Sequence, residues 1–173
     1  AESDHLQSIS TPLAEVVQHE AVAAARQLDP RVRLQLGELS NDVRVDTDPA
    51  ETQRLVARLF EHARGAAEES LAASGDMSAA TREIEATLGW ADRTDAEGRR
   101  LAELVVRYTG SVLTPEMRGI SFQPFDTANG SDESRRLGLA IVHALVLRLG
   151  GDMTVQRDLN GGTTLTVELP AVA

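Results

Sequence analysis

The sequence contains no cysteine and no lysine in its 173 residues. The lack of cysteine excludes disulfides, thiol catalysis and every cysteine-ligated zinc or iron–sulfur centre. All 17 basic residues are arginines, so a phosphate-loop lysine and a Schiff-base lysine are also excluded. Any chemistry of this chain must therefore use other side chains or the backbone.

Aromatic residues and long apolar runs are also scarce. Aromatics make up only 3% of the chain, so the core must be built from Leu, Val, Ile and Ala. No apolar run approaches the roughly 18 residues needed to cross a bilayer, and no signal-peptide pattern opens the sequence. These two absences favour a cytoplasmic location.

Acidic residues outnumber basic ones by 27 to 17, which gives a formal net charge of −10. A field of this sign repels nucleic acids and anionic membranes. We therefore expect no nucleic-acid partner and no direct membrane contact.

The length fits a single domain with a sizeable core. Residues 1–10 are polar and without pattern, and they are interpreted as a linker or tail before a domain at 11–173. Helical periodicity predicts helices at 11–28, 49–70 and 137–149, and a Pro-Glu pair predicts a short helix start at Pro115-Glu116. Alternating or apolar runs predict strands at 31–36, 43–45, 79–92, 100–107, 153–157 and 163–169.

These patterns predict three further features of the fold. The runs at 31–36 and 43–45 are separated by a short polar turn, which predicts a hairpin. The helix at 137–149 is nearly all apolar, so it is expected to be buried on every side, with Gly150-Gly151 as its C-cap. The order of elements predicts a two-layer α/β sandwich, with helices on one face of a mixed sheet.

The last third of the chain carries several linked motifs. They are Phe122-Gln123-Pro124-Phe125, Leu137-Gly138-Leu139, Leu149-Gly150-Gly151 and Gly162-Thr163-Thr164. Together they resemble the catalytic and ATP-binding domain of sensor histidine kinases, in the superfamily shared with gyrase, Hsp90 and MutL. The resemblance covers about residues 12–170. It implies a Bergerat-type ATPase fold with a mostly antiparallel sheet, ATP and magnesium as cofactors, and a role in two-component signalling.

The resemblance places two asparagines on one face of the long helix, where their carbonyls hold magnesium. The matching positions here are Arg58 and His62. Arginine cannot ligate a metal, and histidine is a poor ligand for magnesium. Glu61 keeps the acidic residue often found before the second asparagine and is the candidate catalytic residue. The plainer interpretation is a solvated face for Arg58 and Glu61, and a packed or surface histidine at His62.

Three further positions of the family's site can be matched. Tyr108 stands where the resemblance implies an aspartate that binds the adenine amino group, and Gly110 matches the first glycine after it. Arg136 replaces a glycine of the phosphate-wrapping segment just before the retained Gly138. Arg135 and Arg136 either contact phosphates or form a surface pair. Thr163 either contacts nucleotide or belongs to a hairpin turn.

The residues implied to build the fold are thus kept, and those implied to hold ATP and magnesium are replaced. Each lost buried partner costs about 1–3 kcal/mol, so three or four losses total roughly 4–8 kcal/mol, on the order of 10³-fold or more in affinity. The leading hypothesis is a degenerate ATPase-type domain without a bound cofactor. It acts as a regulatory or interaction module on a protein partner: its own dimerisation helices, a response regulator or another kinase. Homodimerisation would use segments outside this chain.

Two alternatives remain open. In the first, the domain is an active kinase with a divergent site, which transfers the ATP γ-phosphate to a histidine on a separate dimerisation domain. Arg135 or Arg136 then contacts phosphates, Glu61 positions magnesium or water, and Tyr108 stacks on the base. In the second, the chain belongs to a phosphotransfer protein whose helical hairpin lies outside it.

Overall fold

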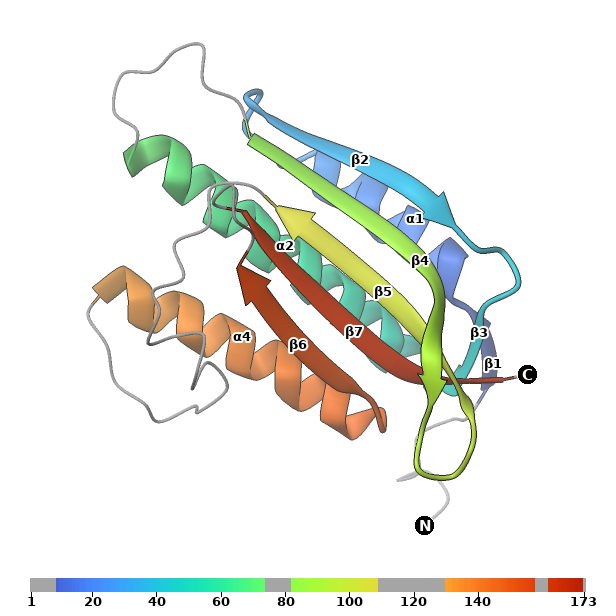
Figure 1. The fold of residues 1–173 in the computed structure, drawn as a ribbon. Helices are drawn as coiled ribbons and strands as arrows, with labels where there is room; N and C mark the ends of the chain where they lie inside the picture. The colour runs from blue at the N-terminus through green and yellow to red at the C-terminus, as the bar shows by residue number, and fades with distance from the viewer. Residues whose placement is uncertain (1–8, 74–81, 109–129, 158–161, 173) are drawn as a thin grey trace.

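A computed structural model of the chain describes residues 9–73, 82–108, 130–157 and 162–172 (Figure 1). The helices are α1 (Leu13–Ala25), α2 (Pro49–Ala73) and α4 (Gly130–Arg148). The strands are β1 (Ile9–Pro12), β2 (Val32–Leu39), β3 (Arg44–Thr47), β4 (Arg82–Thr94), β5 (Arg100–Tyr108), β6 (Asp152–Arg157) and β7 (Thr163–Val172). No helix in the described residues is long and apolar enough to cross a membrane.

The seven strands form one sheet in the order β1-β3-β7-β5-β4-β2, and β6 pairs with β7 on the side of β7 opposite β5. The pairs are antiparallel except β2 with β4, which run parallel. A parallel pair needs a crossover connection, and α2 lies in the segment between these two strands. The predicted mixed, mostly antiparallel sheet is therefore confirmed.

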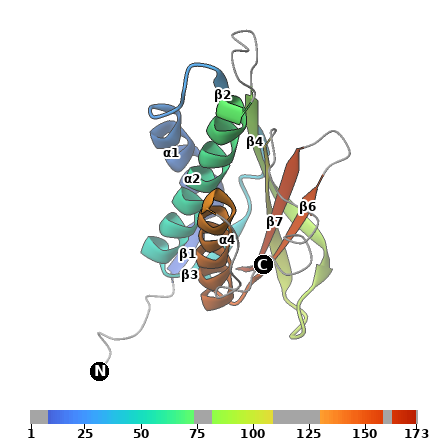
Figure 2. The same cartoon turned by 90° about the vertical axis from the view of Figure 1, so that its left-hand side faces the viewer.

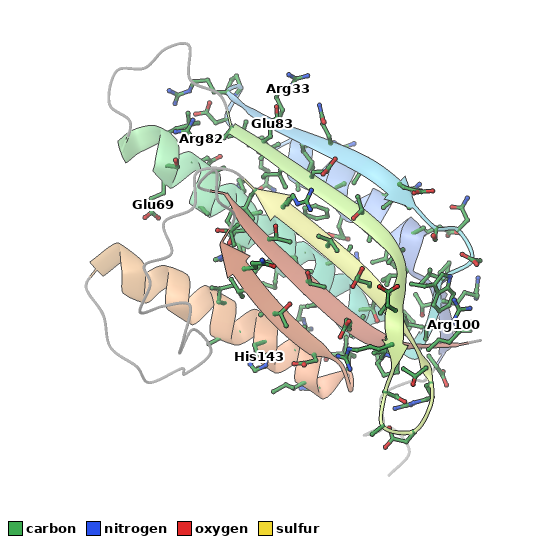
Figure 3. The ribbon with its side chains drawn as sticks, in the orientation of Figure 1. Arg33, Glu69, Arg82, Glu83, Arg100 and His143 are labelled. Atoms are coloured by element: carbon green, nitrogen blue, oxygen red, sulfur yellow. The ribbon has the colours of Figure 1, made fainter. Side chains whose placement is uncertain are left out.

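The helices cover one face of this sheet, with α2 between α1 and α4 (Figure 2). The apolar stripe predicted along α2 is fully buried and forms the centre of the core: Leu55, Val56, Leu59, Phe60, Ala63, Ala66 and Ala67. Charged side chains stand on the sheet face turned away from the helices (Figure 3), including Arg33 of β2, which lies opposite Glu83 of β4. The predicted two-layer α/β sandwich is confirmed.

The predicted hairpin between 31–36 and 43–45 is wrong. β2 pairs with β4, whereas β3 pairs with β1 and β7 at the other side of the sheet. Alternation of polar and apolar residues marks a strand with one buried face, but it carries no information about the partner strand. Here the partners are distant in sequence.

The first strand begins within the predicted tail. Ile9 and Ser10 belong to β1, and the Arg44 side chain donates hydrogen bonds to the Ser10 hydroxyl (2.7 Å) and carbonyl (2.9 Å). The first helix consequently starts at Leu13 rather than at Thr11. Pro12, with an extended backbone, ends the strand and precedes the helix.

The last helix differs from its prediction in length and in burial. It begins at Gly130 instead of 137, and Ile141 and Leu147 are 41% and 54% exposed. The helix packs against α2 and β6, so its outer side faces solvent even though that side is apolar. The short helix expected at Pro115-Glu116 and the Phe122–Phe125 motif lie outside the described residues.

The predicted glycine cap of α4 is confirmed. Gly150 adopts a φ of 81°, which favours glycine, and its N–H donates to the Leu147 carbonyl (3.0 Å). The Gly151 N–H donates to the Val146 carbonyl (2.9 Å). These two bonds form a Schellman motif, which ends the helix and turns the chain into β6.

Candidate functional site

Three elements converge on the residues that sequence analysis singled out. The middle of α2 carries Arg58, Glu61 and His62, and β5 ends at Tyr108. Tyr108 pairs directly with Thr163 at the start of β7, so the two residues lie at the same end of these neighbouring strands. α2 is anchored at its start by Asp48, whose Oδ1 accepts hydrogen bonds from the Ala50 N–H (2.8 Å) and the Glu51 N–H (3.2 Å).

The closest interaction in this region joins His62 to Tyr108. The imidazole Nε2 and the phenol oxygen share a hydrogen bond of 2.9 Å, and the rings meet edge to face with centroids 5.6 Å apart. This contact ties α2 to the end of β5 across 46 residues of sequence. The two positions that the resemblance assigns to magnesium and to adenine are therefore bonded to each other.

Tyr108 is almost fully enclosed, with 3% of its surface exposed. Burial raises the pKa of its phenol far above the usual range, and the neighbouring Thr163 side chain opposes that rise in part. The phenol therefore stays neutral at physiological pH. A neutral phenol cannot supply the negative charge of an aspartate at this position.

Arg58 and Glu61 face solvent on α2. The guanidinium Nη1 of Arg58 lies 3.0 Å from Oε1 of Glu61, and both side chains are about half exposed. This is an ordinary helical ion pair of i, i+3 spacing, worth only a few tenths of a kcal/mol. The geometry matches the solvated-face interpretation of these two residues.

An open groove between α2 and α4 runs past these residues. It encloses about 640 Å³, including space open to solvent. Its lining residues from α2 and α4 are Arg58, Glu61, His62, Gly65, Ala66, Glu69, Gly138, Ile141 and Val142. A β-carbon added to Gly138 would lie 3.6 Å from His62 Nδ1, an ordinary contact distance, so lack of space does not by itself require glycine here.

The structure does not describe the side chains of the remaining predicted residues. Gly110 lies outside the described residues, and Arg135 and Arg136 lie within α4 at positions whose side chains are not described. The His62–Tyr108 hydrogen bond was missed by sequence reasoning. The sequence did contain an indication of this contact, because the resemblance places both residues around one ligand.

Within the described residues, three side chains at this site could take part in binding or catalysis. Glu61 is an exposed carboxylate held by Arg58, and His62 has its Nε2 engaged with Tyr108. Thr163 contributes a fully buried hydroxyl beside Tyr108.

Comparison with known proteins identifies the class to which this fold and site belong. Residues 47–173 match the family model described as histidine kinase-, DNA gyrase B- and HSP90-like ATPase. This match covers more than half of the chain. The chain therefore belongs to this ATPase family, and the resemblance seen in its sequence motifs is confirmed.

Solved structures with the same fold are histidine kinase domains. The catalytic domain of histidine kinase ThkA has a TM-score of 0.72 at 19% identity. The alignment covers 94% of this chain and 96% of the ThkA chain. The mycobacterial sensor histidine kinase MprB has a TM-score of 0.70 at 21% identity, with 95% and 97% coverage. At such identities the likeness defines the fold, which is that of a histidine kinase catalytic domain.

One sequence relative is a histidine protein kinase. The histidine protein kinase DivJ of Caulobacter vibrioides is 36% identical over 73 residues, which are 40% of this chain. The matched segment spans 12% of the length of DivJ. The match therefore concerns a small part of a much longer kinase, and the family membership of this chain rests on the match over residues 47–173.

Proposed function

We propose that this domain is a cytoplasmic regulatory or protein-interaction module of a two-component system, with a nucleotide site too degenerate to bind ATP usefully. The observation that carries the proposal is the His62–Tyr108 hydrogen bond. It engages, within the protein itself, the two side chains that stand at the ligand positions implied for magnesium and adenine.

The described residues do not fit magnesium-bound ATP. At the two magnesium positions, Arg58 carries a fixed positive charge that cannot ligate a metal, and His62 has one ring nitrogen occupied by the Tyr108 phenol. At the adenine position, a buried neutral phenol replaces a carboxylate that would accept from the amino group. We therefore propose no phosphoryl transfer by this chain.

The active-kinase alternative requires Tyr108 to stack on the base. A side chain that is 97% buried and hydrogen-bonded to His62 offers no free ring face for such stacking. The same alternative asks Glu61 to position magnesium, while Glu61 is paired with Arg58 on an exposed helix face. Both observations weigh against it.

We infer the partner class from the family. A solved relative with a TM-score of 0.72 is the full-length histidine kinase ShkA in complex with AMPPNP, and this chain covers 32% of it. We propose that this domain likewise works within or beside a larger kinase, and contacts dimerisation helices, a response regulator or another kinase. The retained fold would then serve recognition rather than nucleotide binding.

Restoring the family residues tests the proposal. A chain with His62→Asn and Tyr108→Asp, titrated calorimetrically with ATP and magnesium, is expected to bind at least tenfold more tightly than the unaltered chain. The matched control is Glu97→Gln, in the exposed turn between β4 and β5, which should change nothing. Tight binding by the unaltered chain, at tens of micromolar or below, would overturn the proposal.

A further inference from the structure

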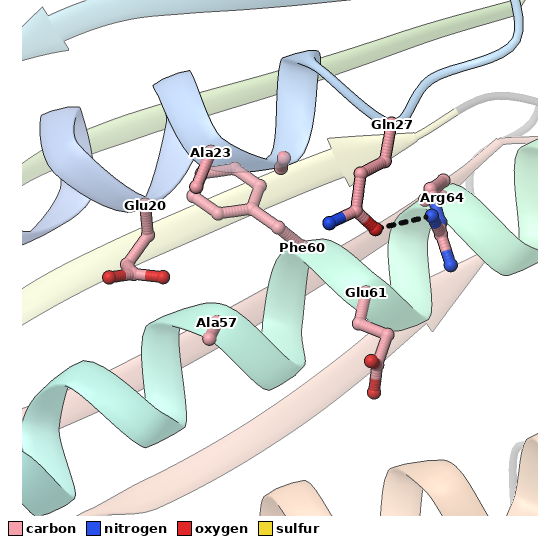
Figure 4. Close-up of a pocket in the computed structure, with 8 residues that line it drawn as sticks. Glu20, Ala23, Gln27, Ala57, Phe60, Glu61 and Arg64 are labelled. Atoms are coloured by element: carbon pink, nitrogen blue, oxygen red, sulfur yellow. Dashed lines mark hydrogen bonds between the residues drawn. The ribbon is translucent and has the colours of Figure 1, made fainter.

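A second groove lies between α1 and α2, on the side of α2 that faces away from α4 (Figure 4, Figure 2). Phe60, only 2% exposed, forms its floor. Ala23 and Ala24 of α1 and Ala57 of α2 form its walls. Such small side chains allow another backbone to approach closely.

This groove continues along α1 into a neighbouring hollow. The second hollow is formed by β1, the first turns of α1 and the start of α2, with Pro12, Val16 and Pro49 as apolar lining residues. Glu20 lines both hollows, so they meet at its side chain. The helix α1 runs beside both hollows and is about 20 Å long, since its 13 residues rise 1.5 Å each. That length matches a helix of three to four turns.

The carboxylate at the junction is unusual in its surroundings. Glu20 is 9% exposed, and among the described residues only Gln53 donates a hydrogen bond to it, from Nε2 to Oε2 at 2.9 Å. His19 Nε2 lies 3.8 Å away, and no arginine of the described residues pairs with it. Burying a carboxylate without a cation beside it costs free energy. A cation that pairs with Glu20 would therefore offset part of this cost.

The charge of the groove has the same sign as that of the whole chain. Glu15, Glu20 and Glu61 line the two hollows, together with one arginine, Arg64. Glu61 is paired with Arg58, whereas Glu15 and Glu20 have no arginine partner among the described residues. The Arg64 side chain is directed to the far end of the groove, where its Nη1 donates to Gln27 Oε1 at 3.0 Å (Figure 4). With a net charge of −10 behind it, this surface attracts a cationic partner.

We infer that the α1–α2 groove docks a cationic amphipathic helix of a protein partner. An arginine or lysine of that helix pairs with Glu20, and its apolar side chains lie over Ala23, Ala57 and Phe60. Apart from Glu61, which lines both grooves, this surface lies on the other side of α2 from the candidate nucleotide site. The inference is therefore independent of whether nucleotide binds.

A library of randomised amphipathic helical peptides displayed on phage provides the test. Peptides selected on the unaltered chain are expected to be enriched in arginine or lysine, and to lose at least tenfold in affinity against Glu20→Gln. Ala57→Arg, which places a cation in the groove, should weaken them similarly. Glu97→Gln, an exposed carboxylate far from the groove, should leave their affinity within twofold.

Failure to select any peptide, selection without basic residues, or affinities unchanged by both Glu20→Gln and Ala57→Arg would overturn the inference. Glu20→Gln keeps an acceptor for Gln53, and thermal unfolding of each variant shows whether it is folded. Nucleotide titration of the same proteins is a separate readout, so failure here is distinguishable from failure of the proposed function.

Discussion

At the scale of single residues, the His62–Tyr108 hydrogen bond is the feature on which the site depends. It is partly buried, with Tyr108 enclosed and His62 half-buried, it joins a helix to a strand, and it involves the one tyrosine of the chain. Such a hydrogen bond contributes to stability chiefly because breaking it leaves the enclosed Tyr108 hydroxyl unsatisfied.

Tyr108→Phe keeps the ring and removes the hydroxyl. We expect the free energy of unfolding to fall by about 1 kcal/mol and the melting temperature by about 2–4 °C, because the hydrogen bond to His62 is lost. Calorimetric unfolding measures both quantities. In a double-mutant cycle with His62→Ala, the two changes should not add. Strict additivity would mean that the hydrogen bond contributes nothing.

Glu103 provides a test of pH dependence. Burial, together with Glu168 opposite it on β7 and with Asp92, raises the pKa of its carboxyl. A raised folded-state pKa means that the charged form destabilises the fold, and this penalty appears as pH rises through that pKa. Glu103→Gln should therefore raise the melting temperature by about 1–2 °C at pH 7. The gain should vanish below about pH 4, where the carboxyl is protonated. An equal gain at both pH values would contradict this cause.

At the scale of elements, two glycines differ sharply in what they permit. A β-carbon at Gly151 would lie 2.2 Å from the Glu168 carbonyl oxygen, which is backbone of β7 and cannot move aside cheaply. A β-carbon at Gly65, on α2, meets nothing within 4 Å. The first glycine therefore fixes how α4 turns into β6, and the second does not.

Gly151→Ala is expected to destabilise the domain by about 1–3 kcal/mol through this clash. Gly65→Ala, the matched control, should stabilise it by about 0.5–1 kcal/mol because alanine favours the helix. Denaturant unfolding of the two variants measures both values. Equal effects of the two substitutions would show that the close approach of the Glu168 carbonyl is not what makes Gly151 necessary.

The elements also show what sequence alone could predict. The burial of α2 along Leu55, Leu59 and Ala63 follows from a local 3.6-residue period, and it was predicted correctly. The pairing of β2 with β4 was not, because strand partners depend on contacts distant in sequence. The exposure of Ile141 likewise depends on which neighbours cover α4.

At the scale of the whole molecule, the two layers bring α2, β5 and β7 together at one site and leave open grooves on both sides of α2. The family motifs located the site from sequence, because they match positions around one ligand. They did not reveal that His62 and Tyr108 bond to each other, since 46 residues separate them and neither has a local pattern that requires the other. The retained scaffold with altered ligand positions is the basis of the account.

Calorimetric titration of the unaltered chain with ATP and with ADP, first with magnesium and then with EDTA, tests that account most directly. We expect no detectable heat of binding at millimolar nucleotide under either condition. Magnesium-dependent binding at tens of micromolar or tighter would contradict it, because the site would then hold nucleotide despite the His62–Tyr108 hydrogen bond.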